Sequence, residues 1–90
     1  MVKQKKSDTV FAAQIRAGRQ LASKTQRQLA DAAQVSLSTI EAIEGNRSKP
    51  IPATRAAIVR VFGDWGVRLK DNGEVGALID RARLEAPEES

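Results

Sequence analysis

The apolar positions near the start of the chain repeat with the period of an α-helix, in steps of four, three and four residues. They are Phe11, Ile15, Gly18 and Ala22. A side-chain oxygen of Ser7, Asp8 or Thr9 can cap the start of such a helix. The pattern therefore predicts a first helix that runs to about Ala22, with this face turned towards the core.

Residues 25–47 predict two short helices joined by a tight corner. Thr25 is a good N-cap and Gln28 stands three residues later, a spacing that forms a capping box. Ser36 offers a second cap, so the next helix starts within three residues of the end of the first. Such a short connection makes the two helices cross steeply, as in a helix-turn-helix. The residues expected to hold them together are Leu29, Ala30, Val35, Ile40 and Ile43.

The remaining third predicts one more helix and a segment with two interpretations. Pro50 and Pro52 stop the preceding helix, and a fourth helix is expected from about Pro52 to about Phe62. Residues 67–70 and 74–79 flank an Asp-Asn-Gly turn, which predicts a two-stranded hairpin. A final helix over residues 75–84 fits the same apolar positions.

Ninety residues suffice for one hydrophobic core, so a single domain is expected. Its helical body would span residues 8–66, preceded by a flexible basic arm over residues 1–7. The hairpin or helix over residues 67–84 could contact a second copy, and residues 85–90 form an acidic tail expected to be disordered. Trp65 is expected to cover the core or to contact another subunit.

The chain contains no Cys and no His. It therefore lacks the usual zinc ligands, a thiol nucleophile and an imidazole base, and we expect neither an enzyme nor a bound metal or cofactor. No apolar run approaches the roughly 20 residues of a membrane helix. The absence of Cys also fits a cytoplasmic protein, and no membrane partner is expected.

The net charge of +4 is unevenly distributed. Residues 1–60 hold eleven Lys or Arg against four Asp or Glu, which leaves +7, and residues 61–90 hold four against seven, which leaves −3. The basic part contains the predicted helix pair. A positive field there would attract a polyanion and would make binding weaken with salt, as in nucleic-acid contact.

Along the helix pair the chain reads Gln-x-x-Leu-Ala-x-x-Ala-x-Val-Ser-x-x-Thr-Ile-x-x-Ile-Glu-x-x-Arg. This pattern resembles the phage-repressor and Cro-like (Xre) helix-turn-helix family, and the similarity covers about residues 15–69. The resemblance implies a mainly α fold, a compact four- to five-helix repressor-like DNA-binding domain with a short C-terminal β-hairpin as an option. Residues 36–44 would be the recognition helix, which lies in the DNA major groove in that family.

The chain departs from the family pattern at two backbone positions. The corner usually has Gly, and here it has Gln34, which costs about 1 kcal/mol if the backbone is left-handed. The Gly that usually closes the second helix is present as Gly45 followed by Asn46, and either residue can adopt a left-handed cap.

The resemblance also implies roles for individual residues. Arg19 would pair with Glu44 and join the first helix to the end of the recognition helix. Contacts to base edges would come from Leu37, Ser38 and Ala42, although Leu37 could instead close the core. Contacts to DNA phosphates would come from Gln26, Arg27, Ser36, Thr39, Arg47 and Lys49.

The leading interpretation is a sequence-specific transcriptional regulator, expected to be a repressor that binds double-stranded DNA as a homodimer. One alternative is an antitoxin-type regulator whose acidic C-terminus contacts a toxin. A second alternative is a helical protein-interaction module that keeps the fold and has lost DNA reading. The positions assigned to base contacts hold Leu37, Ser38 and Ala42 and include no Arg, Asn or Gln, which favours the module. The excess of positive charge in residues 1–60 favours the regulator.

Overall fold

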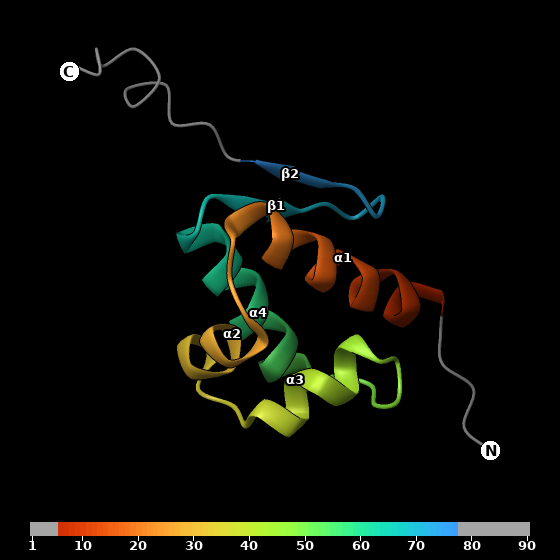
Figure 1. Ribbon diagram of the computed structural model, residues 1–90. Coiled ribbons are helices and arrows are strands. Elements are labelled where there is room, and N and C mark those ends of the chain that lie inside the picture. The colour runs from red at the N-terminus through yellow and green to blue at the C-terminus, as the bar shows by residue number, and fades with distance from the viewer. Residues whose placement is uncertain (1–5, 78–90) are drawn as a thin grey trace, which may run out of the picture.

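The computed structural model describes residues 6–77 of the chain. Of these residues 64% are helical, and they include one two-stranded antiparallel sheet. The elements, labelled in Figure 1, are α1 (Lys6–Ala22), α2 (Gln26–Ala33), α3 (Leu37–Glu44), α4 (Pro52–Asp64), β1 (Val67–Leu69) and β2 (Val75–Ala77). The expectation of a mainly helical, compact fold is confirmed in this coarse form. Most of the expected arm and the whole acidic tail lie outside the described residues.

α1 carries the apolar face that the spacing predicts. Phe11 and Ile15 are fully buried, and Gly18 is buried as well. A β-carbon at Gly18 would stand 3.0 Å from Cε1 of Phe62, so the absence of a side chain lets α1 and α4 approach closely. The helix already includes Lys6 and Ser7, which the sequence had assigned to the arm over residues 1–7.

The capping interactions predicted for α2 and α3 are present. The Thr25 hydroxyl accepts from the Gln28 amide at 3.0 Å, and Oε1 of Gln28 accepts from the Thr25 amide at 2.8 Å. At the start of α3, Oγ of Ser36 accepts from the Thr39 amide at 3.1 Å. Each cap satisfies backbone donors that the first helical turn leaves without a partner.

Two left-handed residues end α2 and α3. Gln34 has φ 61°, and the amides of Gln34 and Val35 both donate to the Ala30 carbonyl, so the chain turns directly towards α3. After α3 the left-handed residue is Asn46, with φ 59°, whereas Gly45 has φ −81°. The side-chain amide of Asn46 donates to the Thr9 hydroxyl at 3.2 Å, so this turn also contacts α1.

The segment after α4 is a hairpin in the described residues. β1 and β2 pair with Leu69 opposite Val75, and residues 71–73 form the connecting loop. Gly73 has φ 93°, and its amide donates to the Lys70 carbonyl at 3.1 Å, as in a three-residue hairpin loop that ends in a left-handed glycine. A final helix starting at residue 75 is therefore wrong for residues 75–77, and residues 78–84 lie outside the described part.

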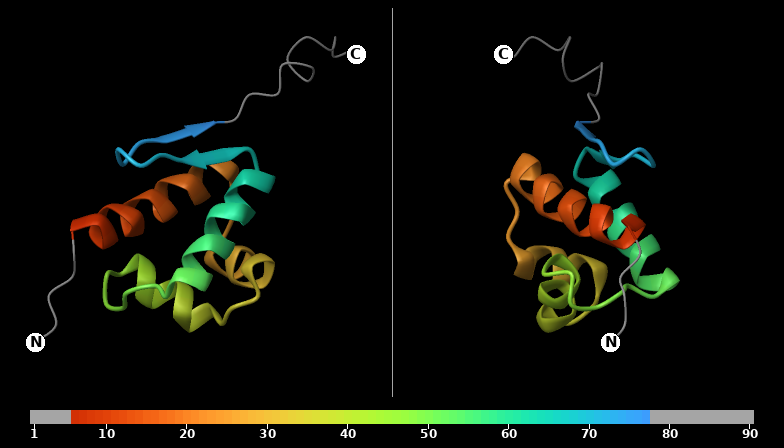
Figure 2. Two further views of the ribbon diagram at one scale, coloured as in Figure 1. Left: turned by 180° about the vertical axis from the view of Figure 1, so that it is seen from behind. Right: turned by 90° about the vertical axis from the view of Figure 1, so that its right-hand side faces the viewer.

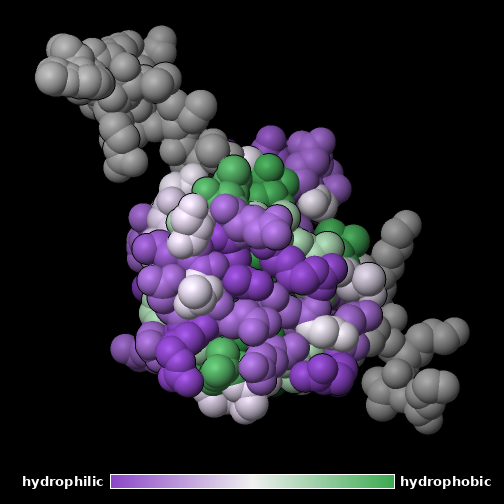
Figure 3. Space-filling model, viewed as in Figure 1, coloured by the Kyte–Doolittle hydropathy of each residue, from purple (hydrophilic) through white to green (hydrophobic). Residues whose placement is uncertain are grey.

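α1 lies between the hairpin and the α2–α3 pair in all three views (Figures 1 and 2). α4 contacts both α2 and β1 and so joins the two sides. Trp65 packs edge-on against Phe62, with ring centroids 5.6 Å apart, and covers the core beside α4. The buried core consists of Phe11, Ile15, Leu29, Ala30, Ala33, Ile40, Ile43, Ile58, Val61, Phe62 and Val67. The face seen in Figure 3 is mainly hydrophilic, with apolar areas near the hairpin and at the opposite end.

The left-handed backbone at Gln34 yields a stability prediction. Gln34→Gly should raise the free energy of unfolding by up to about 1 kcal/mol, because glycine adopts this conformation without the clash of a β-carbon. The measurement is equilibrium unfolding in urea. Ala32→Gly, at an exposed position within α2, is the matched control and should lower the same quantity by about 1 kcal/mol. Equal losses in both variants would contradict the prediction.

Candidate nucleic-acid interface

The last residue of α3 is fixed by side chains from α1 and α2. Glu44 is only 4% exposed, and its carboxylate accepts from Arg19 Nε at 2.6 Å and from Arg19 Nη2 at 3.0 Å. Nε2 of Gln26 donates to the same carboxylate at 3.2 Å. The Arg19–Glu44 pair that the resemblance implied is present, with two parallel hydrogen bonds.

A second arginine of α1 contributes to this attachment. Arg16 donates to the backbone carbonyl of Glu44, a group that the end of a helix leaves without an internal partner. Arg19 also donates to the Lys24 carbonyl at 3.0 Å. Sequence reasoning did not assign Arg16, although its position three residues before Arg19 places both on the same side of α1.

The start of α3 presents hydroxyl groups to solvent. Ser36 and Ser38 are exposed, and Thr39 is half-buried. Oγ of Ser36 lies 2.7 Å from Oγ1 of Thr39 and 3.2 Å from Oγ of Ser38. These hydroxyls satisfy one another locally, and each can still accept or donate at a phosphate or base edge.

The three positions proposed for base contacts differ in exposure. Ser38 is exposed, whereas Leu37 and Ala42 are half-buried. Leu37 packs against the core, which was the alternative role considered for it. The apolar area that Leu37 and Ala42 could offer to a thymine methyl group is therefore reduced.

The cations proposed for phosphate contacts lie at exposed positions. Arg27 is in the first turn of α2, and Arg47 and Lys49 are in the loop that follows α3. The Arg47 amide donates to the Ala42 carbonyl at 2.8 Å, which fixes the start of that loop to α3. Gln26 differs from the expectation, because its side chain is half-buried and directed to Glu44.

α2, α3 and the following loop lie on the side of α1 opposite to the hairpin (Figures 1 and 2). These elements contain the exposed Ser36 and Ser38 at the start of α3 together with the three exposed cations. Among residues 6–77, no group of His, Cys, Asp or Glu is arranged to hold a metal ion. Within the same residues, no helix has the length and apolarity needed to cross a membrane.

Comparisons with protein-family models, curated proteins and solved structures gave no match.

The buried carboxylate at the end of α3 yields a second stability prediction. Glu44→Gln should lower the free energy of unfolding by about 3 kcal/mol or more, because Arg19 would lose its counter-charge in a largely buried position. Arg19→Met combined with Glu44→Met should recover part of that loss, since neither charge is then left alone. Urea unfolding measures both variants.

Asp64→Asn is the matched control for Glu44→Gln. Asp64 is 70% exposed and lies 3.7 Å from Arg60, so its removal should change the free energy of unfolding by no more than about 1 kcal/mol. If Glu44→Gln were as mild as this control, the ion pair would not fix the end of α3.

Proposed function

We propose that the chain binds double-stranded DNA with α3 as the recognition helix of a helix-turn-helix, and that it acts as a transcriptional regulator, expected to be a repressor. The observation that carries the proposal is the contrast between the two sides of α3. Its inner residues Ile40 and Ile43 are buried and its end is fixed through Glu44, while the hydroxyls at its start remain exposed. A rigid helix with an exposed polar start suits insertion into a major groove.

The surrounding cations support the same proposal. Arg27 precedes α3 in the chain, and Arg47 and Lys49 follow it, so exposed positive charge flanks the helix on both sides in sequence. The positive ends of α2 and α3 add unpaired amides that favour a phosphate. Contacts of this kind hold a protein on the DNA backbone and set its register.

Base reading in this proposal depends mainly on Ser38. A serine hydroxyl can donate or accept at several bases, so it discriminates weakly between sequences. Leu37 and Ala42 contribute through the parts of their side chains that stay accessible. DNA shape and deformability would then supply a substantial share of the specificity.

The proposed regulator binds as a homodimer, because one short helix in one groove provides few contacts. The hairpin within residues 67–84, one candidate for the contact between copies, lies across α1 from α3 (Figure 2). Selection of bound sequences from random DNA tests the pairing: a two-fold symmetric site supports it, and a single asymmetric half-site argues against it.

A helical protein-interaction module is the second candidate. The half-burial of Leu37 and Ala42 and the inward hydrogen bond of Gln26 favour it, since they remove contacts that DNA reading would use. The antitoxin alternative places a toxin contact in the acidic C-terminus, which lies outside the described residues. The interaction module requires no affinity for DNA, whereas an antitoxin-type regulator would also bind an operator. DNA binding that weakens with salt therefore argues against the module and is compatible with both kinds of regulator.

The loop after α3 yields a binding prediction. Arg47→Ala combined with Lys49→Ala should weaken binding to duplex DNA and reduce the slope of log K against log salt by about 2, because each lost phosphate contact removes about 0.9. The measurement is fluorescence anisotropy of labelled duplex DNA at several salt concentrations.

Arg60→Ala combined with Arg68→Ala is the matched control, since it removes the same charge. Arg60 and Arg68 are exposed on α4 and β1, and β1 lies across α1 from α3. The control should leave the slope close to that of the unaltered chain. Equal slopes for the two double variants, or the absence of salt-dependent binding in the unaltered chain, would contradict DNA binding through this side.

The start of α3 yields a prediction that separates folding from binding. Ser38→Asp should keep or slightly raise the free energy of unfolding, because an acid in the first turn interacts favourably with the helix dipole. The same change should weaken DNA binding by at least about tenfold, because it places a negative charge against the phosphates. Ser23→Asp, at an exposed position after α1, is the control and should bind nearly as well as the unaltered chain.

A further inference from the structure

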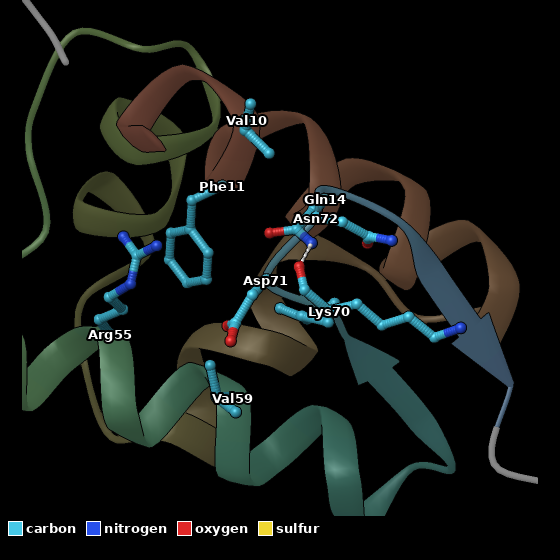
Figure 4. Close-up of a pocket in the computed structure, with 9 residues that line it drawn as sticks. Val10, Phe11, Gln14, Arg55, Val59, Lys70, Asp71 and Asn72 are labelled. Atoms are coloured by element: carbon cyan, nitrogen blue, oxygen red, sulfur yellow. Dashed lines mark hydrogen bonds between the residues drawn. The ribbon is translucent and has the colours of Figure 1, made fainter. Parts of the chain in front are cut away.

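A cavity of about 580 Å³ opens between α1, α4 and the hairpin loop (Figure 4). Its volume falls within the range of small-molecule sites in proteins. Phe11, Val59 and Leu69 supply apolar lining from three different elements. Val59 is 42% exposed, so an apolar side chain of α4 faces this open space. The cavity is separate from the candidate nucleic-acid interface, because none of the residues assigned to that interface lines it.

The wall formed by the hairpin is held in place by a buried amide. Gln14 is 5% exposed, and its Nε2 donates to the Lys70 carbonyl at 2.7 Å and to the Glu74 carbonyl at 3.1 Å. These bonds attach both ends of the hairpin loop to α1. Because the loop between them carries Asp71 and Asn72, both line the cavity from a fixed position.

Arg55 brings a positive charge to the cavity, and its guanidinium donates no hydrogen bond to any of the residues that the structure describes. Its guanidinium lies 4.1 Å from the centroid of the Phe11 ring and 3.8 Å from Oδ1 of Asp8. Asp8 is 6% exposed, and its Oδ2 has no hydrogen-bond partner among the described residues. The ion pair orients Arg55, but 3.8 Å is too long for a hydrogen bond, so the guanidinium donors remain available to a ligand.

Asp71 brings a negative charge to the same cavity. Figure 4 shows its carboxylate directed towards Val59, with the Phe11 ring between it and Arg55. No ion pair joins Asp71 to any residue within the described part of the chain. Lys70, the other cation of the lining, extends away from this space and lies 3.5 Å from Glu74. The cavity therefore presents one cation and one anion on either side of an apolar floor.

We propose that this cavity binds a small zwitterion with an apolar body, of the amino-acid type. Its carboxylate would accept two hydrogen bonds from Arg55, its ammonium would contact Asp71, and its apolar part would cover Val59. A simple carboxylate would meet repulsion from Asp71, and a simple amine would meet repulsion from Arg55. The proposal is independent of DNA binding, because every group that it uses lies outside the candidate nucleic-acid interface.

The test is a titration of the isotope-labelled full chain in the absence of DNA. Binding is monitored through the shifts of the backbone amide signals in NMR spectra. The probes are leucine, phenylalanine, 4-methylpentanoate, which is leucine without its amine, and 3-methylbutylamine, which is leucine without its carboxylate. Saturable shifts at residues that line the cavity are expected with at least one amino acid, with at least about tenfold weaker binding of the two single-charge compounds. Equal binding of 4-methylpentanoate and leucine, or no saturable shift with either amino acid, would overturn the proposal.

Two variants test the assigned charges. Asp71→Asn should weaken binding of the amino acid by about tenfold, and Asp31→Asn, an exposed acid of α2, should leave it unchanged. Arg55→Lys keeps a positive charge beside Asp8 but loses the planar guanidinium that can donate two parallel hydrogen bonds to a carboxylate, so it should also weaken binding. Arg60→Lys is the control and should leave binding unchanged, because Arg60 does not line the cavity. Because Asp71 is exposed in a loop, its replacement should leave the fold intact. Unaltered affinity in Asp71→Asn would overturn the assignment.

Discussion

The carboxylate of Glu44 is a charge placed almost entirely out of water, and the arrangement of three helices follows from that constraint. Such a charge is stable only with full compensation, which Arg19 provides from α1 and Gln26 from the start of α2. Arg16 binds the adjacent carbonyl at the end of the same helix. A buried ion pair adds little net stability compared with an apolar contact, so its main effect is to fix the orientation of α3 against α1.

α1 organises two different regions because it carries polar anchors for both. Arg16 and Arg19 attach the end of α3, and Gln14 attaches the hairpin loop. The same helix contributes Phe11 both to the core and to the cavity lining. A helix with attachments on two sides keeps the proposed DNA-binding region and the cavity apart, and each can be tested without the other.

The core competes with the proposed DNA-reading function for the same short helix. α3 has eight residues and must bury Ile40, Ile43 and Glu44, which leaves a narrow outer side. Leu37 packs partly against the core, so it has less apolar area to offer to a base. The position of Ser38 is free of this competition, which makes it the most informative residue for the proposed readout.

Features that depend on neighbours in the sequence could be predicted from the sequence. The capping box at Thr25 and the cap at Ser36 each follow from local backbone chemistry, and the Asp-Asn-Gly turn predicted the hairpin as one of two interpretations of its segment. The possibility of a left-handed corner at Gln34 came from the family pattern. Helical periodicity likewise predicted the buried face of α1, and the family pattern implied the pairing of Arg19 with Glu44. The inward turn of Gln26, the contact of Arg16 with Glu44 and the placement of Arg55 and Asp71 at one cavity were decided only by tertiary packing. Each brings together residues that are distant in the chain, and no local pattern encodes their distance in space.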